Sequence, residues 1–95
     1  MLSQIPIDLK IIEGENLDNQ ILRTAIIAEL DAINLYEQLA LKTQNNDLQE
    51  ILLDVAKEEK THIGEFQALL LKKDKEQMQE LKNGKKEVEE ELKNH

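Results

Sequence analysis

The sequence contains no cysteine, no tryptophan, one proline and two aromatic residues, Tyr36 and Phe66. The absence of cysteine excludes a disulfide framework and a thiolate metal site. Two aromatic side chains are too few for a base-stacking platform, and the formal net charge of −8 is opposite in sign to the basic surface of nucleic-acid-binding proteins. The chain is therefore expected to bind no nucleic acid.

Long apolar runs are also missing. No run approaches the ~18–20 residues of a transmembrane helix, and residues 1–15 lack the basic segment and the continuous apolar segment of a secretory signal. We therefore expect a cytoplasmic protein without a membrane partner. The length of 95 residues fits one small domain, or part of an assembly, with a modest hydrophobic core.

Acidic charge is concentrated before residue 72. Residues 1–71 contain 13 acidic and 5 basic side chains, whereas residues 72–95 contain 7 of each. The acidic region is thus the part of the chain that could attract cations.

Breaks in the helical pattern divide the chain into three regions. Residues 1–15, which contain the single proline, are expected to form an extended N-terminal arm. Residues 16–73 are predicted to form an antiparallel helical hairpin with its turn at residues 42–47. Residues 74–95 are predicted to form a short C-terminal helix followed by a charged, helical tail.

Capping signals indicate where the helices begin and end. The candidate start signals are Asn16–Asp18 for the first helix, Asn46 with Gln49 for the second, and Asp74 with Gln77 for the third. The third helix is expected to end near Asn83–Gly84, because glycine commonly follows the last helical residue.

Apolar residues in both hairpin helices recur every three or four positions, as on a helix face that packs against a neighbour. The first helix has one such seam at Leu22, Ile26, Glu29, Ile33, Tyr36 and Ala40, and a second at Ile21, Ala25, Ala28, Ala32, Leu35 and Leu39. The second helix has a seam at Leu48, Leu52, Val55, Glu59, His62, Phe66 and Leu69. Since one hairpin cannot cover two faces of the first helix, another chain is expected to cover the second seam.

Glu29, Glu59 and His62 are the ionisable residues that interrupt these seams. In an antiparallel hairpin, residues equidistant from the turn face each other, and the midpoints between Glu29 and each of the other two fall in the turn. At a rise of ~1.5 Å per residue, all three side chains lie within about one helical turn of the same height. Glu59 and His62 share a face because they are three residues apart. The three side chains are therefore predicted to converge.

Buried carboxylates are costly without a compensating charge, and a divalent cation would supply it. Two glutamates and a histidine suit iron, manganese or zinc better than calcium or magnesium. Di-iron carboxylate bundles use a Glu from each of two helices and a Glu-x-x-His from each of the other two. The hairpin contains half of that set, so a two-fold homodimer would complete both a four-helix bundle and a two-metal site.

Simpler readings of the same residues remain open. Glu59 and His62 could form an exposed ion pair that contributes only ~0.3–0.5 kcal/mol. Tyr36, about 10 Å from Glu29 along the helix axis, could hydrogen-bond near the site, take part in electron transfer, or be a plain core residue. Asp31, Glu58 and Glu65 are either solvated or guide cations toward the site.

Two sequence blocks, AELDAINLYEQLA and ILLDVAKEEKTHIGEFQALL, resemble the encapsulated ferritins, a branch of the ferritin-like superfamily. The resemblance covers roughly residues 22–71. In that family a two-helix protomer dimerises to build a di-iron ferroxidase centre. The dimers form a ring of ten subunits inside an encapsulin shell, where the oxidised iron is mineralised.

The resemblance implies roles for individual residues. Glu29, Glu59 and His62 would ligate iron from both protomers, Tyr36 would lie near the centre, and Asp31 would lie on the path by which metal enters. Leu35 stands where some members have tryptophan. No short C-terminal address for a shell is visible after residue 84, and some relatives are fused to the shell protein, so the chain could be an excised domain.

The sequence thus predicts an all-α protein: an antiparallel two-helix hairpin plus a short C-terminal helix, which dimerises into a ferritin-like four-helix bundle. The predicted function is a ferroxidase that oxidises Fe(II) with dioxygen at a di-iron centre for iron storage. Its predicted location is an encapsulin nanocompartment in the cytoplasm. The alternatives are a rubrerythrin-like di-metal peroxidase or oxidase, and a non-enzymatic helical assembly module.

Overall fold

The computed structural model describes residues 14–93 and places the side chains of residues 16–93. These residues form three helices and no strand: α1 (Gly14–Lys42), α2 (Asn46–Lys73) and α3 (Lys75–Lys93). Residues 1–13 of the predicted arm lie outside the described residues, whereas Gly14 already belongs to α1. The predicted all-α class and the helical hairpin are confirmed.

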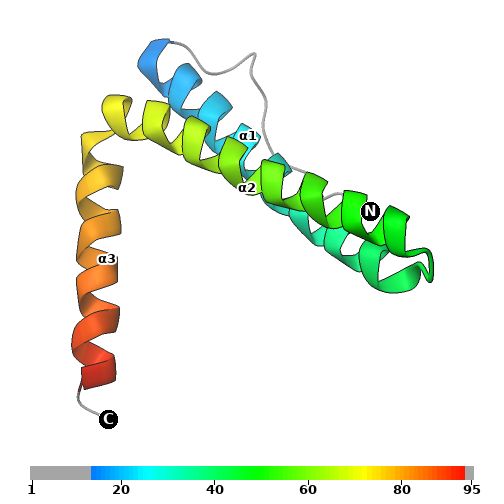
Figure 1. Ribbon diagram of the computed structural model, residues 1–95. Helices are drawn as coiled ribbons and strands as arrows, with labels where there is room; N and C mark the ends of the chain where they lie inside the picture. Colours follow the sequence, from blue (N-terminus) through cyan, green and yellow to red (C-terminus); the bar gives the residue numbers. More distant parts are fainter. Residues whose placement is uncertain (1–13, 94–95) are drawn as a thin grey trace.

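Helices α1 and α2 lie side by side and antiparallel, joined by the short turn at residues 43–45 (Figure 1). The N-cap of α2 is Asn45, whose side-chain oxygen accepts a hydrogen bond from the Leu48 amide at 2.9 Å. The predicted capping box on Asn46 is therefore wrong by one residue. The Gln49 side chain donates instead to the Ala40 carbonyl at 2.9 Å, because the last carbonyls of α1 lack partners within their own helix.

The hydrophobic core of the single chain is small. Among the described residues, the buried apolar side chains are Ile33 and Ala40 on α1 and Ala56 and Leu70 on α2. Ile33 and Ala40 belong to the first predicted seam of α1, but Ala56 and Leu70 lie outside the predicted seam of α2. Leu48 and Leu69 of that seam are 48% and 52% exposed, because the face of α2 that packs against α1 is turned toward Ala56 and Leu70. The other residues of the two seams are half-buried. One copy of the chain therefore leaves much of its apolar surface in contact with solvent.

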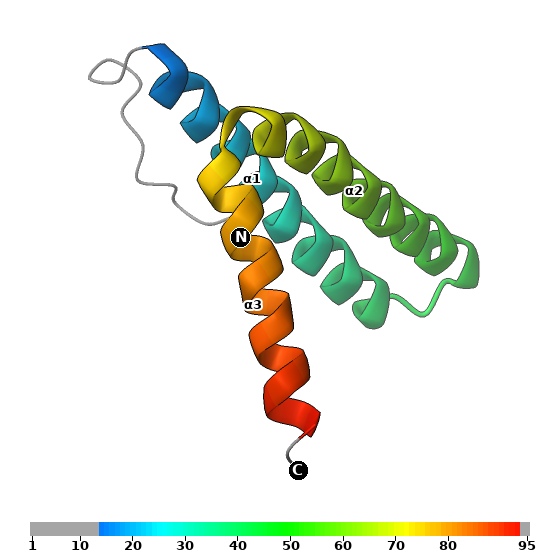
Figure 2. The same cartoon turned by 90° about the vertical axis from the view of Figure 1, so that its left-hand side faces the viewer.

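Asp74 joins α2 to α3 and caps both helices. Its backbone N–H donates to the Leu70 carbonyl at 2.8 Å, and its side chain accepts from the Gln77 amide at 2.9 Å. The predicted start signal of the third helix is thus confirmed. Arg23 of α1 forms an ion pair with the Asp74 carboxylate and donates from Nε to the Gln77 side chain at 3.0 Å. These contacts hold α3 at a steep angle to the hairpin (Figure 1), and α3 crosses in front of α1 in the view of Figure 2.

Helix α3 does not end at Asn83–Gly84, as the sequence predicted, but continues to Lys93. A glycine inside a helix costs only about 1 kcal/mol. Side-chain contacts one turn apart support the helix on both sides of Gly84: Asn83 contacts Glu80 at 2.9 Å and Lys85 contacts Glu89 at 3.9 Å. Across residues 14–93, no helix combines the length and apolar character needed to cross a membrane.

Candidate metal centre

Glu29 of α1 and the pair Glu59 and His62 of α2 converge on one point of the hairpin. Nδ1 of His62 lies 3.4 Å from Oε2 of Glu29 and 3.5 Å from Oε2 of Glu59. One potential ligand atom from each residue lies within 4.8 Å of the others. In the described part of the chain, these three side chains form a group that could hold a metal ion.

The convergence follows from the local sequence. Glu59 and His62 are three residues apart on one helix face. The short turn at residues 43–45 aligns the helices so that positions equidistant from it meet, which brings Glu29 level with both. The structure therefore places these three residues together as the sequence predicted.

Burial of the three side chains is uneven. The side chains of Glu29 and Glu59 are 21% and 18% exposed, whereas that of His62 is 44% exposed. Among residues 14–93, His62 contacts both carboxylates, and neither of them pairs with Lys or Arg. Two partly desolvated carboxylates beside one imidazole form a site that a cation would stabilise.

The donor set fits a transition-metal ion. Carboxylate oxygens and an imidazole nitrogen bind iron, manganese and zinc, whereas calcium and magnesium sites use oxygen ligands throughout. Three protein donors leave coordination positions open for further ligands. The group could therefore hold a metal ion.

The other predicted site residues lie outside this group. Tyr36 is half-buried on α1, and no hydrogen bond joins it to Glu29, Glu59 or His62 in the described structure. Asp31 is half-buried, and because it follows Glu29 by two residues it lies on a different side of α1. Their roles stay predictions.

The apolar surface beside the metal group is exposed on both helices. On α2, Ile51 and Leu69 lie 11 residues before and 7 residues after His62, on the same line of the helix, and are 60% and 52% exposed. On α1, Ile21 and Leu39 of the second seam are 42% and 43% exposed. We call this surface the site flank and define it as Ile21, Ala25, Ala28, Ala32, Leu35 and Leu39 of α1 with Ile51 and Leu69 of α2.

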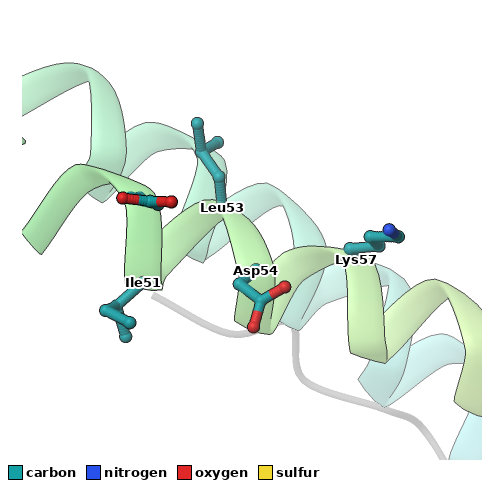
Figure 3. A pocket seen from close by; sticks show the side chains of 5 residues that line it. Ile51, Leu53, Asp54 and Lys57 are labelled. Atoms are coloured by element: carbon teal, nitrogen blue, oxygen red, sulfur yellow. The ribbon is translucent and has the colours of Figure 1, made fainter. Parts of the chain in front are cut away.

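Sequence reasoning did not single out a shallow hollow on α2 near the turn. It is lined by Glu50, Ile51, Leu53, Asp54 and Lys57, and Ile51 and Leu53 point to opposite sides of α2 (Figure 3). Glu50 and Asp54 are exposed and do not belong to the metal group. The hollow shows that apolar side chains are exposed on both sides of α2.

Three comparisons with known proteins agree with this fold. A family model described as rubrerythrin matches residues 20–94. A ferritin-like–encapsulin shell fusion protein of Pyrococcus furiosus is 63% identical over 71 residues, which are 75% of this chain and 21% of that protein. The crystal structure of the encapsulated ferritin domain from Pyrococcus furiosus superposes with a TM-score of 0.81 at 51% identity, over 92% of this chain and 94% of that chain.

An all-helical hairpin whose two helices hold a Glu–Glu–His group defines a ferritin-like protein. The chain belongs to the rubrerythrin family, and its resemblance to the encapsulated ferritins is confirmed. Family membership supports an iron-related, ferritin-like role. The chain spans about a fifth of the length of the fusion protein that it matches.

Proposed function

We propose that the protein is a ferroxidase that binds two Fe(II) ions between two subunits and oxidises them to Fe(III) with dioxygen. The observation that supports this most strongly is the position of Glu29, Glu59 and His62, which converge next to an exposed apolar flank. Because the three ligands lie beside an exposed apolar surface, a second copy that covers this surface could also supply the remaining ligands.

Two-fold pairing through the site flank would bring two of each ligand together. The resulting four carboxylates carry four negative charges, which balance the four positive charges of two Fe(II) ions. The same pairing would cover the half-exposed apolar side chains of the site flank. Packing and metal binding therefore favour the same assembly, a four-helix bundle with the ligands inside it.

The residues of the site would bind the substrate iron and release the product. Each Fe(II) loses one electron, so two ions supply the two electrons that reduce one dioxygen, with two protons, to hydrogen peroxide. The charge of the metal pair rises from four to six, while the four carboxylates stay at four. Hydrolysis of Fe(III), which releases protons, would offset this excess positive charge as the iron passes to a mineral. Tyr36 would lie next to the oxidising centre.

The setting of this activity is part of the proposal. The matched relative carries a ferritin-like region and an encapsulin shell in one protein, as its name states. We extend this association to the present chain: iron storage inside an encapsulin nanocompartment, with dimers assembled into a ring. Asp31 would lie on the path by which Fe(II) reaches the site.

The family match supports a second candidate, a rubrerythrin-like enzyme that uses peroxide. In that reaction two Fe(II) ions and two protons reduce one hydrogen peroxide to two water molecules. The two candidates differ in the oxidant, so the rate of Fe(II) oxidation with dioxygen and with hydrogen peroxide separates them. A helical assembly module without enzymatic activity would oxidise Fe(II) no faster than buffer.

Oxygen uptake after addition of Fe(II) tests the proposal. Glu59→Gln and His62→Ala should abolish the uptake that exceeds the buffer rate. Glu50→Gln is the matched control, because it removes the same charge from an exposed position of α2 outside the metal group. Wild-type uptake in the Glu59 and His62 variants would refute the assignment. Iron analysis without chelator should give about one iron per chain in the wild type.

A further inference from the structure

An asparagine–glycine pair, Asn83 and Gly84, lies in the middle of α3. Among the asparagines of the sequence, Asn83 is the one that precedes a glycine. The main-chain nitrogen of Gly84 is tethered close to the side-chain amide carbon of Asn83, and no Cβ shields it. Attack of this nitrogen on that carbon closes a succinimide ring. The pair is therefore a candidate site of covalent modification.

Two neighbouring side chains hold the Asn83 amide in place. Gln79 donates from Nε2 to Oδ1 of Asn83 at 3.0 Å, and Nδ2 of Asn83 donates to Oε2 of Glu80 at 2.9 Å. Both partners lie in the first half of α3, before Asn83. The Gln79 donor faces the oxygen on which negative charge develops during attack, as a donor in an oxyanion hole does. Contacts within the same helix thus activate the Asn83 amide toward a nucleophile.

The intact helix keeps that nucleophile away from the Asn83 side chain. In a continuous α-helix the Gly84 N–H donates to the carbonyl of Glu80, four residues earlier, and the Asn83 side chain points back toward the N-terminus. The reaction therefore requires α3 to open at Gly84. Opening costs little, because α3 has no buried residue, extends away from the hairpin (Figure 1) and contains a glycine of low helix propensity at this point. When residues 85–93 unwind alone, Gln79 and Glu80 keep their places while the Gly84 nitrogen is released.

Basic charge surrounds the released nitrogen. Residues 81–86 contain three lysines and no acid. An amide nitrogen attacks only after it has lost its proton, and positive charge nearby stabilises the anion that results. The carboxylate of Glu80, the acid that precedes this basic segment, is held at the Asn83 amide instead. The charge pattern of α3 therefore favours the reactive form of the Gly84 nitrogen.

We propose that Asn83 is a self-modification site, at which the Gly84 nitrogen displaces the side-chain amide group when α3 opens. A bond forms between the Gly84 nitrogen and Cγ of Asn83, and the bond from Cγ to Nδ2 breaks. Ammonia leaves and carries the proton that the Gly84 nitrogen lost. Water then opens the succinimide at either carbonyl, which gives aspartate or isoaspartate. The net reaction exchanges ammonia for water and needs neither an oxidant nor a cofactor.

Both products weaken α3 at its midpoint. Aspartate places a second carboxylate beside Glu80 and removes the N–H group that Glu80 accepts. Isoaspartate lengthens the main chain by one methylene group and so interrupts the ladder of helical hydrogen bonds. Modification therefore divides one continuous helix into a shorter helix that ends near residue 83 and a separate charged tail.

Incubation of the 95-residue chain in warm buffer with chelator, followed by peptide mapping with mass spectrometry, tests the proposal. Deamidation should be several-fold faster at Asn83 than at Asn34, which is also exposed to solvent on a helix but precedes leucine. Gly84→Ala should slow the reaction at Asn83 at least roughly fivefold through helix propensity alone. This variant should fold normally, because a Cβ at residue 84 meets nothing within 4 Å. A rate at Asn83 no higher than at Asn34, or an unchanged rate in Gly84→Ala, would overturn the proposal.

Gln79→Leu tests the contact that the structure assigns to the reaction. Leucine and glutamine have similar helix propensities, so hydrogen exchange at the Gly84 amide, which reports the opening of α3, should stay unchanged. Deamidation at Asn83 should nevertheless fall several-fold, because the donor to Oδ1 is lost. An unchanged deamidation rate would overturn the role of Gln79. Since chelator keeps the metal site empty, either result leaves the ferroxidase proposal untouched.

Discussion

Leu69→Ala should weaken dimerisation through the site flank without unfolding the chain. Leu69 lies two helical turns from His62 and is 52% exposed in the single chain. Removing three carbons from a fully buried leucine costs about 2.4 kcal/mol in transfer free energy, at about 0.8 kcal/mol per carbon. About half of that, roughly 1.2 kcal/mol, is gained only when a second copy covers the exposed part of the side chain.

A two-fold dimer contains the substitution twice, so the loss is about 2.4 kcal/mol, or roughly 50-fold in the dimer dissociation constant. Sedimentation velocity over a concentration series, in anaerobic buffer with Fe(II), measures this constant. Leu41→Ala is the matched control: Leu41 is 81% exposed, but it follows Leu39 by two residues and so lies on the other side of α1. Equal dissociation constants for Leu69→Ala and the wild type would refute the site flank as the interface.

Three further substitutions test the description of the single chain. Arg23→Met removes the ion pair to Asp74 and the hydrogen bond to Gln77. Because Arg23 is 44% exposed, the free energy of unfolding in urea should fall by only about 1 kcal/mol. An unchanged free energy of unfolding would refute the role of Arg23 at the junction. Gly64→Ala should raise the free energy of unfolding by about 0.5–1 kcal/mol, because a Cβ there meets nothing within 4 Å; destabilisation of the assembly would instead reveal a close neighbour. Leu70→Ala should lower it by about 2–5 kcal/mol, because Leu70 is only 1% exposed; a loss below 1 kcal/mol would contradict its place in the core.

The helical hairpin could be predicted because its determinants are local. Seams with 4-3-4 spacing define the helices, and a short polar turn requires them to be antiparallel. That geometry alone brings Glu29 to the height of Glu59 and His62, although they are 30 and 33 residues apart. The convergence of the three residues could therefore be predicted from their nearly equal sequence distances to the turn.

Other features depend on interactions that spacing does not determine. The steep angle of α3 depends on the contact between Arg23 and Asp74, which are 51 residues apart on different helices. The N-cap of α2 is Asn45 and not the predicted Asn46, because two adjacent asparagines are equally good N-cap residues by sequence. Gly84 did not end α3 because contacts on both sides of it offset its low helix propensity.

The central claim is that two copies of the chain complete one two-iron site. Native mass spectrometry of the protein loaded with Fe(II) under anaerobic conditions tests it most directly, because it reports subunit number and bound iron in the same particle. We predict that iron is carried by dimers, or by multiples of dimers, with two ions per pair of chains. Monomers that carry iron, or dimers of the Glu59→Gln variant that still carry two ions, would contradict the account.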